Sequence, residues 1–178
     1  MVDVQEKLVP TIVDWQTVVQ NCRRVLEAAG AFDVPVIATE QYPKGLGPTV
    51  APLRRLLGSA ALPSKKTFSC VPCLSRQVQD DDGRDQLVVV GIETHVCVLQ
   101  TVLELLAMGL RVHVVVDAVG SRGRLDHEVA LRQMEQHGAV PTTTEIVLFQ
   151  WCRTADDARF PVVRRLVTEP DRPLEDAQ

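Results

Sequence analysis

Cys97 is the residue of this chain best placed to do chemistry. An apolar run over 86–92 predicts a buried strand, and a helical pattern begins after a short turn, close to Cys97. Unpaired N–H groups at a helix start favour a thiolate, so a cysteine there can act as a nucleophile. The position also suits a small buried apolar side chain, which is the commoner role of a free cysteine.

A cysteine nucleophile needs a base or a cation that stabilises its thiolate, and donors that bind an oxyanion. Asp3 could supply the base, and Lys65 or Lys66, just before Thr67-Phe68-Ser69, could supply the cation. Each also has a simpler interpretation. Asp3 could be a surface turn residue, and the two lysines could be solvated charges. No spacing argument alone brings these residues to Cys97.

Alternating strands and helices must position these side chains. Apolar runs predict strands at 34–39, 62–69, 86–92, 110–117 and 140–143. Helical spacing predicts helices at 14–30, 71–79, 96–108, 124–137, 145–151 and 156–168, and Pro and Gly mark 40–52 as an ordered loop. This pattern predicts an α/β fold, a three-layer (αβα) Rossmann-like, mostly parallel sheet. A single domain over 1–168 is expected, followed by a polar tail at 169–178.

Sites in such sheets form at the carboxyl ends of the strands. That rule selects Asp3, Thr39, the turn at 92–97 and Asp117 as candidates. Only two residues precede Asp3, too few for a strand. We therefore expect an apolar segment upstream of Met1.

Composition excludes several classes of function. The net charge is −4 and only 4% of the 178 residues are aromatic, which disfavours a nucleic-acid partner. No apolar run approaches the roughly 20 residues that span a membrane, and no signal peptide opens the chain. Five cysteines without framework spacing favour reduced thiols, so we expect a cytoplasmic protein or another reducing compartment.

Five motifs follow one another along nearly the whole chain: Val2-Asp3-Val4-Gln5, Lys65-Lys66-Thr67-Phe68-Ser69, Gly91-Ile92-Glu93-Thr94-His95-Val96-Cys97-Val98, Val115-Val116-Asp117-Ala118 and Thr142-Thr143-Thr144-Glu145. Their order and spacing resemble the isochorismatase-like cysteine hydrolases, and the third motif is the specific one. The loop at 39–48 resembles the small isochorismatase-domain-containing proteins of this family. The family often forms dimers or larger assemblies, so the resemblance implies a homo-oligomer.

The resemblance implies a catalytic triad of Asp3, Lys65 and Cys97. Lys65 is preferred to Lys66 because the family's lysine lies three residues before the aromatic that precedes serine. Asp3 would take the thiol proton and later activate water, while Lys65 would stabilise the thiolate and keep Asp3 ionised. The thiolate would attack a carbonyl of a small-molecule substrate, ammonia or an amine would leave, and water would cleave the thioester.

The resemblance also implies an oxyanion hole. The family's non-proline cis peptide maps to Ile92–Glu93, and the backbone N–H groups of Glu93 and Cys97 would face the oxyanion. Placement at strand ends suggests four side chains that line the substrate pocket: Gln5, Thr39, Tyr42 and Phe68.

One departure from the family narrows the chemistry. Nicotinamidases of this family bind a metal through an Asp-x-His…His arrangement after the second strand, where this chain reads Thr39-Glu40-Gln41-Tyr42-Pro43. We therefore expect no metal, no cofactor and no nicotinamide substrate. True isochorismatases cleave a vinyl ether without a thiol nucleophile, so Cys97 favours C–N or thioester chemistry.

Other signals have simple interpretations. Cys70 and Cys73 form a C-x-x-C, but without a second pair or a histidine at ligand spacing they are expected to be ordinary cysteines rather than a redox or zinc pair. His95 is expected to line the turn or pocket, and His113 to pack in a strand. The acidic run at 80–82 reads as a solvated turn.

Three hypotheses for function remain at this point. The leading one is a metal-independent cysteine amidohydrolase. The alternative is a non-enzymatic binding or interaction protein with the same fold. A nucleic-acid-processing protein is disfavoured by charge and composition.

Overall fold

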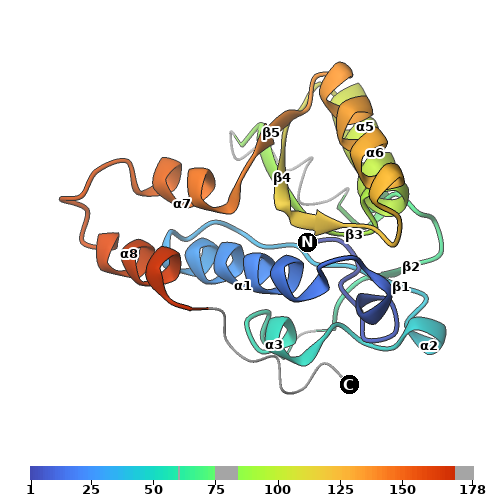
Figure 1. The fold of residues 1–178 in the computed structure, drawn as a ribbon, viewed down its shortest axis with the longest axis horizontal. Coiled ribbons are helices and arrows are strands. Elements are labelled where there is room, and N and C mark those ends of the chain that lie inside the picture. Colours follow the sequence, from blue (N-terminus) through green and yellow to red (C-terminus); the bar gives the residue numbers. More distant parts are fainter. Residues whose placement is uncertain (60, 75–83, 171–178) are drawn as a thin grey trace.

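The computed structural model describes residues 1–59, 61–74 and 84–170, which form a mixed α/β domain (Figure 1). Parallel strands form the middle layer. Helices α1, α7 and α8 pack together on one face, and α5 and α6 pack together on the other. The predicted three-layer α/β architecture is confirmed.

The helices and strands follow one another as α1 (Trp15–Ala31), β1 (Glu40–Gln41), α2 (Pro43–Leu46), α3 (Ala51–Arg54), β2 (Ser64–Lys65), β3 (Gln86–Ile92), α5 (Leu99–Ala107), β4 (Arg111–Gly120), α6 (Arg124–Gln136), β5 (Val140–Thr142), α7 (Thr144–Cys152) and α8 (Phe160–Thr168). A 3-10 turn covers Val9–Thr11, and a π-helical turn covers Thr94–Val98 directly before α5.

The first residues of the chain join the two parts of the sheet. β3, β4 and β5 pair in parallel, and so do β1 and β2. Val2 forms parallel bridges to Gly91 of β3 on one side and to Thr39, next to β1, on the other. Successive strands of the chain are therefore added outward on both sides of Val2, β1 and β2 on one side and β3, β4 and β5 on the other. Sites in open α/β sheets form at such a switch point, and Asp3 lies there.

Most predicted elements are confirmed within a few residues, and the differences have local causes. Residues 34–38 form no strand, because among the described residues no strand pairs with them and pairing begins only at Thr39; Pro35 also has no N–H to donate. The predicted loop at 40–52 contains β1 and two short helices. The helix predicted from residue 156 begins only at Phe160, because Asp157 binds the backbone and side chain of Arg159 in a turn.

One predicted strand is shorter in the structure, and other predicted segments lie partly outside the described residues. The strand predicted over 62–69 is paired only at Ser64–Lys65. Residues 71–74 are helical as predicted, while 75–79, the acidic run at 80–82 and the tail from 171 lie outside the described residues. Among the described residues, we find no helix with the length and apolar character needed to cross a membrane.

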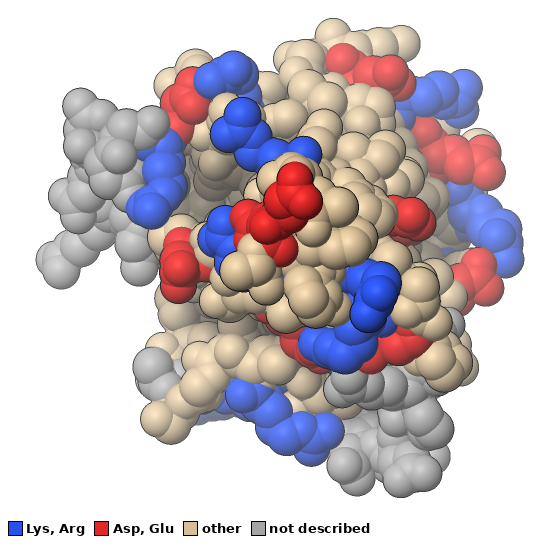
Figure 2. Space-filling view, turned by 90° about the vertical axis from the view of Figure 1, so that its left-hand side faces the viewer, with Lys and Arg blue, Asp and Glu red and all other residues tan. Residues whose placement is uncertain are grey.

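The surface agrees with the composition. Basic and acidic side chains are interspersed on the face where α7 and α8 meet, the left-hand side of Figure 1 (Figure 2). This face therefore lacks the continuous basic patch that binding a phosphate backbone needs.

Gly91 allows the first residues to enter the sheet. Its φ is +122°, and a Cβ there would lie less than 3.0 Å from the backbone nitrogen, carbon and oxygen of Val2. Those backbone atoms cannot withdraw, because the Val2 amide donates to Val90 O at 2.8 Å and Val2 O accepts from the Ile92 amide at 2.9 Å. Gly91 thus sets the distance between β3 and Asp3.

We predict that Gly91→Ala destabilises the protein more than Gly138→Ala. Both glycines have positive φ, but a Cβ at Gly138 meets no atom within 4 Å. Backbone strain costs about 1–3 kcal/mol in each variant, and the collision with Val2 adds about 2 kcal/mol at Gly91. Thermal unfolding measures the difference, about 4–8 °C in Tm. Equal Tm values for the two variants would contradict this account.

Candidate active site

A buried ion pair between Asp3 and Lys65 forms the centre of the site. Lys65 Nζ lies 2.6 Å from Asp3 Oδ2, and the side chains are 3% and 0% exposed. The ammonium also donates to the carbonyls of Phe68 at 2.9 Å and Thr67 at 3.3 Å, and to Gln41 Oε1 at 3.3 Å. Burial alone lowers the pKa of Lys65, but the hydrogen bond and charge of Asp3 outweigh it and raise that pKa. Lys65 is therefore a permanent cation at neutral pH.

The second carboxylate oxygen of Asp3 is also held. Thr39 Oγ1 donates to Asp3 Oδ1 at 2.8 Å, and the Asp3 amide donates to Thr39 O at 3.2 Å. The backbone of Asp3 is left-handed (φ 48°), a conformation that Asp tolerates better than most residues. Cys70 Sγ lies 3.2 Å from Thr39 Oγ1. Asp3 is thus oriented by two neighbouring segments, those of Thr39 and Lys65.

Cys97 faces this carboxylate from the π-helical turn after β3. Burial is the largest cause that raises the pKa of the Cys97 thiol to about 12. The negative charge of Asp3 and the hydrogen bond to Asp3 also raise this pKa, while the charge of Lys65 lowers it. The prediction that a helix start holds Cys97 as a thiolate is therefore wrong for the resting protein. The turn begins at Thr94, so Cys97 is not at its first residues, and it is 6% exposed. At neutral pH it is a thiol beside a carboxylate.

The turn between β3 and Cys97 is fixed by side-chain contacts. The Ile92–Glu93 peptide is cis, as the family resemblance implies. Glu93 Oε2 accepts hydrogen bonds from the Arg122 amide at 3.1 Å and from Arg122 Nε at 3.0 Å. His95 Nδ1 lies 3.0 Å from Ser121 Oγ, so its contact is with the loop after β4, as expected of a residue that lines the turn.

The four predicted pocket residues have different surroundings. Gln5 is buried, and its side chain binds Gln41 N (2.7 Å), Gln41 O (3.0 Å) and Gly47 O (2.7 Å), so it holds the loop after β1 in place. Thr39 orients Asp3. Tyr42 and Phe68 are each 50% exposed, next to the segments that bind Lys65. The exposed pair is accessible to a small molecule, while Gln5 contacts Gln41 and Gly47, and Thr39 contacts Asp3.

Two residues near the triad were not identified from the sequence. Gln41 contacts Lys65, and Cys70 contacts Thr39. Cys70 directly follows the 65–69 motif, and this position was the only feature of the sequence that could have indicated that Cys70 lies near Lys65. Cys70 and Cys73 are both free thiols. His113, predicted to pack in the core, instead contacts Gln86 Oε1 at 3.2 Å.

No metal centre is evident in the described part of the chain. Within residues 1–59, 61–74 and 84–170, no group of three or more His, Cys, Asp or Glu side chains is arranged to hold a metal ion. Asp3, Lys65 and Cys97 bring a carboxylate, an ammonium group and a thiol to this site.

Known proteins are similar to this chain over most of its length. Residues 1–146 match the isochorismatase domain model. Isochorismatase domain-containing protein 2A of Mus musculus is 43% identical over 173 residues, which cover 94% of this chain and 81% of the mouse protein. The bovine isochorismatase domain-containing protein 2 is 42% identical with the same coverage.

Two solved structures show the same fold. The structure titled MAR1 ribonuclease from Caenorhabditis elegans is 39% identical, with a TM-score of 0.89, over 98% of this chain and 90% of that one. The Escherichia coli YcaC gene product, titled an octameric hydrolase of unknown specificity, is 24% identical, with a TM-score of 0.78, over 94% of this chain and 89% of that one. With the domain match and the curated relatives, these findings show that the chain belongs to the isochorismatase family.

Proposed function

We propose that this protein is a metal-independent cysteine hydrolase that cleaves a C–N bond of a small carbonyl compound through a thioester. The observation that carries the proposal is the 2.6 Å buried ion pair between Asp3 and Lys65, with Cys97 facing its carboxylate. A carboxylate paired with an ammonium group and next to a thiol is a base in place for proton transfer.

The proposed reaction begins with proton transfer. The Cys97 thiol gives its proton to Asp3 as the sulfur attacks the substrate carbonyl, so a resting thiolate is not required. The N–H groups of Glu93 and Cys97 receive the oxyanion. The tetrahedral intermediate breaks its C–N bond, and the leaving amine takes the proton from Asp3.

Hydrolysis of the thioester completes the cycle. Asp3, again a carboxylate, takes a proton from water as the water oxygen attacks the thioester carbonyl. The C–S bond breaks, the acid product leaves, and the sulfur takes the proton back from Asp3. Lys65 keeps its proton throughout and lowers the energy of each state in which sulfur carries negative charge.

A second candidate function comes from one relative. The Caenorhabditis elegans protein is titled a ribonuclease at 39% identity, so RNA hydrolysis is the rival activity. The net charge of −4 favours a small substrate over RNA, and the α7–α8 face in Figure 2 carries interspersed charges in place of a basic patch. The octameric YcaC title also supports our proposal that this chain is a homo-oligomer.

Replacing the nucleophile tests the proposal. We predict that Cys97→Ala lowers ammonia or amine release from a panel of small amides and ureido compounds by about 10³-fold or more. The half-buried Cys73→Ala is the matched control and should keep wild-type turnover. An RNA oligonucleotide in the same panel separates the candidates, because Cys97-dependent RNA cleavage without amide hydrolysis would overturn the C–N proposal. If the protein turned over no member of this panel, the non-enzymatic alternative would be favoured.

Breaking the ion pair should cost stability as well as activity. We predict that Lys65→Met removes turnover and destabilises the fold by about 3–5 kcal/mol, because it leaves the Asp3 charge buried without its partner. Lys66→Met is the matched control, since Lys66 is exposed. Urea unfolding and turnover measure both effects. If Lys66→Met abolished activity and Lys65→Met did not, the choice between the two lysines would be reversed.

Because Asp3 raises the pKa of Cys97, removing the Asp3 charge should speed alkylation of the thiol while it stops turnover of substrate. Asp3 raises this pKa and Lys65 lowers it, so Asp3→Asn should lower the pKa and increase the thiolate fraction at pH 8. We predict faster alkylation of Cys97 by iodoacetamide, about tenfold for each unit of change, together with loss of turnover. Thr39→Val keeps the Asp3 charge and should not accelerate alkylation. An unchanged alkylation rate in Asp3→Asn would contradict the proposed role of Asp3.

A further inference from the structure

Cys70 is linked to the base and to the nucleophile of the proposed triad by two short hydrogen-bonded paths. Its sulfur lies 3.2 Å from Thr39 Oγ1, and that hydroxyl donates to Asp3 Oδ1 at 2.8 Å. Its amide donates to Thr101 Oγ1 at 2.9 Å, and that hydroxyl donates to the carbonyl of Cys97 at 2.6 Å. A change at Cys70 therefore reaches both Asp3 and Cys97.

The path through Thr39 determines which group donates at each step. A hydroxyl has one hydrogen, and the Thr39 hydroxyl gives it to Asp3, a carboxylate paired with Lys65. In the contact between Cys70 and Thr39 the thiol is therefore the donor. A disulfide has no S–H hydrogen, so it cannot make this contact as a donor. The oxidation state of Cys70 thus decides whether the Thr39 hydroxyl receives a hydrogen bond from it.

The C-x-x-C at residues 70–73 places a second thiol one turn away from Cys70. The Cys73 amide donates to Cys70 O at 2.8 Å, so these residues form a turn closed between its first and fourth members. The outer Cα atoms of such a turn lie less than about 7 Å apart, and a disulfide joins Cα atoms about 4.4–6.8 Å apart. The turn therefore holds two free thiols within disulfide range.

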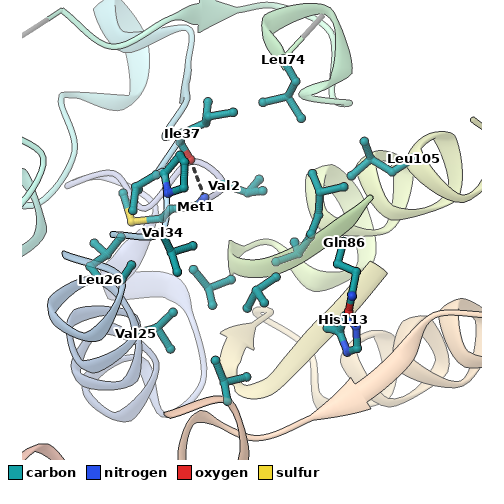
Figure 3. Close-up of a pocket in the computed structure, with 18 of the residues that line it drawn as sticks. Met1, Val2, Val25, Leu26, Val34, Ile37, Leu74, Gln86, Leu105 and His113 are labelled. Carbon is teal, nitrogen blue, oxygen red and sulfur yellow. Dashed lines mark hydrogen bonds between the residues drawn. The ribbon is translucent and has the colours of Figure 1, made fainter. Parts of the chain in front are cut away.

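The two thiols differ in their access to solvent. Cys70 is 2% exposed, whereas Cys73 is half-buried. Leu74, the next residue, is buried, and Figure 3 shows it at one side of a cavity that it lines. A reagent from solvent therefore reaches Cys73 first, and Cys70 on the inner side reacts second.

We propose that Cys70 and Cys73 form a thiol–disulfide exchange site for a low-molecular-weight disulfide, and that oxidation of this site lowers turnover at the triad. The Cys73 thiolate attacks one sulfur of the small disulfide, the S–S bond of that molecule breaks, and one small thiol leaves. Cys70 then attacks the Cys73 sulfur and releases the second small thiol. The two protein thiols are oxidised and give up two protons, and the small disulfide is reduced to two thiols that take them.

Oxidation of the pair has a defined consequence for Asp3. The Cys70 sulfur, bonded to Cys73, no longer donates to the Thr39 hydroxyl. Hydrogen bonds in a chain polarise one another, so the bond from Thr39 to Asp3 weakens when the first donor is lost. A less well oriented base lowers turnover, by at least about tenfold. This effect on turnover rests on the proposed function, while formation of the disulfide does not.

Treatment with glutathione disulfide tests the exchange site. It is done at about pH 8.5, because burial raises the pKa of Cys73 and the thiolate is the attacking species. We expect the wild type to lose two hydrogens in intact mass, at the fragment that holds both cysteines. Cys70→Ser should stop at a mixed disulfide on Cys73, and Cys73→Ala should leave Cys70 reduced. Two free thiols after treatment, or a bridge to Cys97 instead, would overturn the proposal.

Turnover tests the coupling between this pair and the triad. Oxidised wild type should lose at least about tenfold in turnover and regain it with dithiothreitol. Cys73→Ala, treated identically, keeps Cys97 and should keep its turnover, which separates the effect of the pair from direct modification of the nucleophile. Unchanged turnover in a fully oxidised wild type would overturn the coupling.

Alkylation of Cys97 tests the coupling without a substrate, so a failed hydrolase assay does not affect it. Cys70 is one of the groups that raise the pKa of Cys97, and a disulfide cannot ionise. Iodoacetamide should therefore modify Cys97 at least about twofold faster in the oxidised wild type than in the reduced protein. In Cys73→Ala the same treatment should leave the rate unchanged. Equal rates in oxidised and reduced wild type would overturn the coupling.

Discussion

The buried contact between Asp3 and Lys65 is the interaction on which the site depends. Its partners come from the first residues of the chain and from β2, which lies beyond β1 in the sheet. They meet only when the Val2 segment lies between Gly91 and Thr39 and β2 has paired with β1. Formation of the charge pair is thus coupled to completion of the central sheet.

Two buried charges need more than each other. Lys65 has three further acceptors, and Asp3 has the Thr39 hydroxyl, so the hydrogen-bonding capacity that burial removes from water is replaced by fixed protein groups. Gln5 holds Gln41 in place from behind. These contacts leave Asp3 little freedom to move, which suits the base that the proposed cycle uses twice.

The sequence was sufficient for the layers and for the residues at strand ends, because apolar runs and helical spacing reflect burial directly. β3, α1 and α6 follow their predicted ranges closely. The contact between Asp3 and Lys65 was expected only from the family resemblance, since the two residues are 62 positions apart in sequence and no local pattern joins them.

The sequence did not predict the electrostatics of Cys97 or the role of Gln5. The pKa of a thiol depends on burial and on the sign of the nearest charge, and a helix start indicates neither. The apolar residues 34–38 predict a strand, but pairing requires a neighbouring strand as well as a suitable sequence.

The approach of Val2 to Gly91 has a consequence for how the two positions can vary. The atoms of residue 2 that meet Gly91 all belong to the backbone, which every amino acid shares. Residue 2 can therefore be replaced by other apolar residues without disturbing this contact, whereas position 91 accepts only glycine. The contact requires glycine at position 91 but constrains only the backbone of residue 2. Co-variation between the two positions should therefore be absent even though they are in contact.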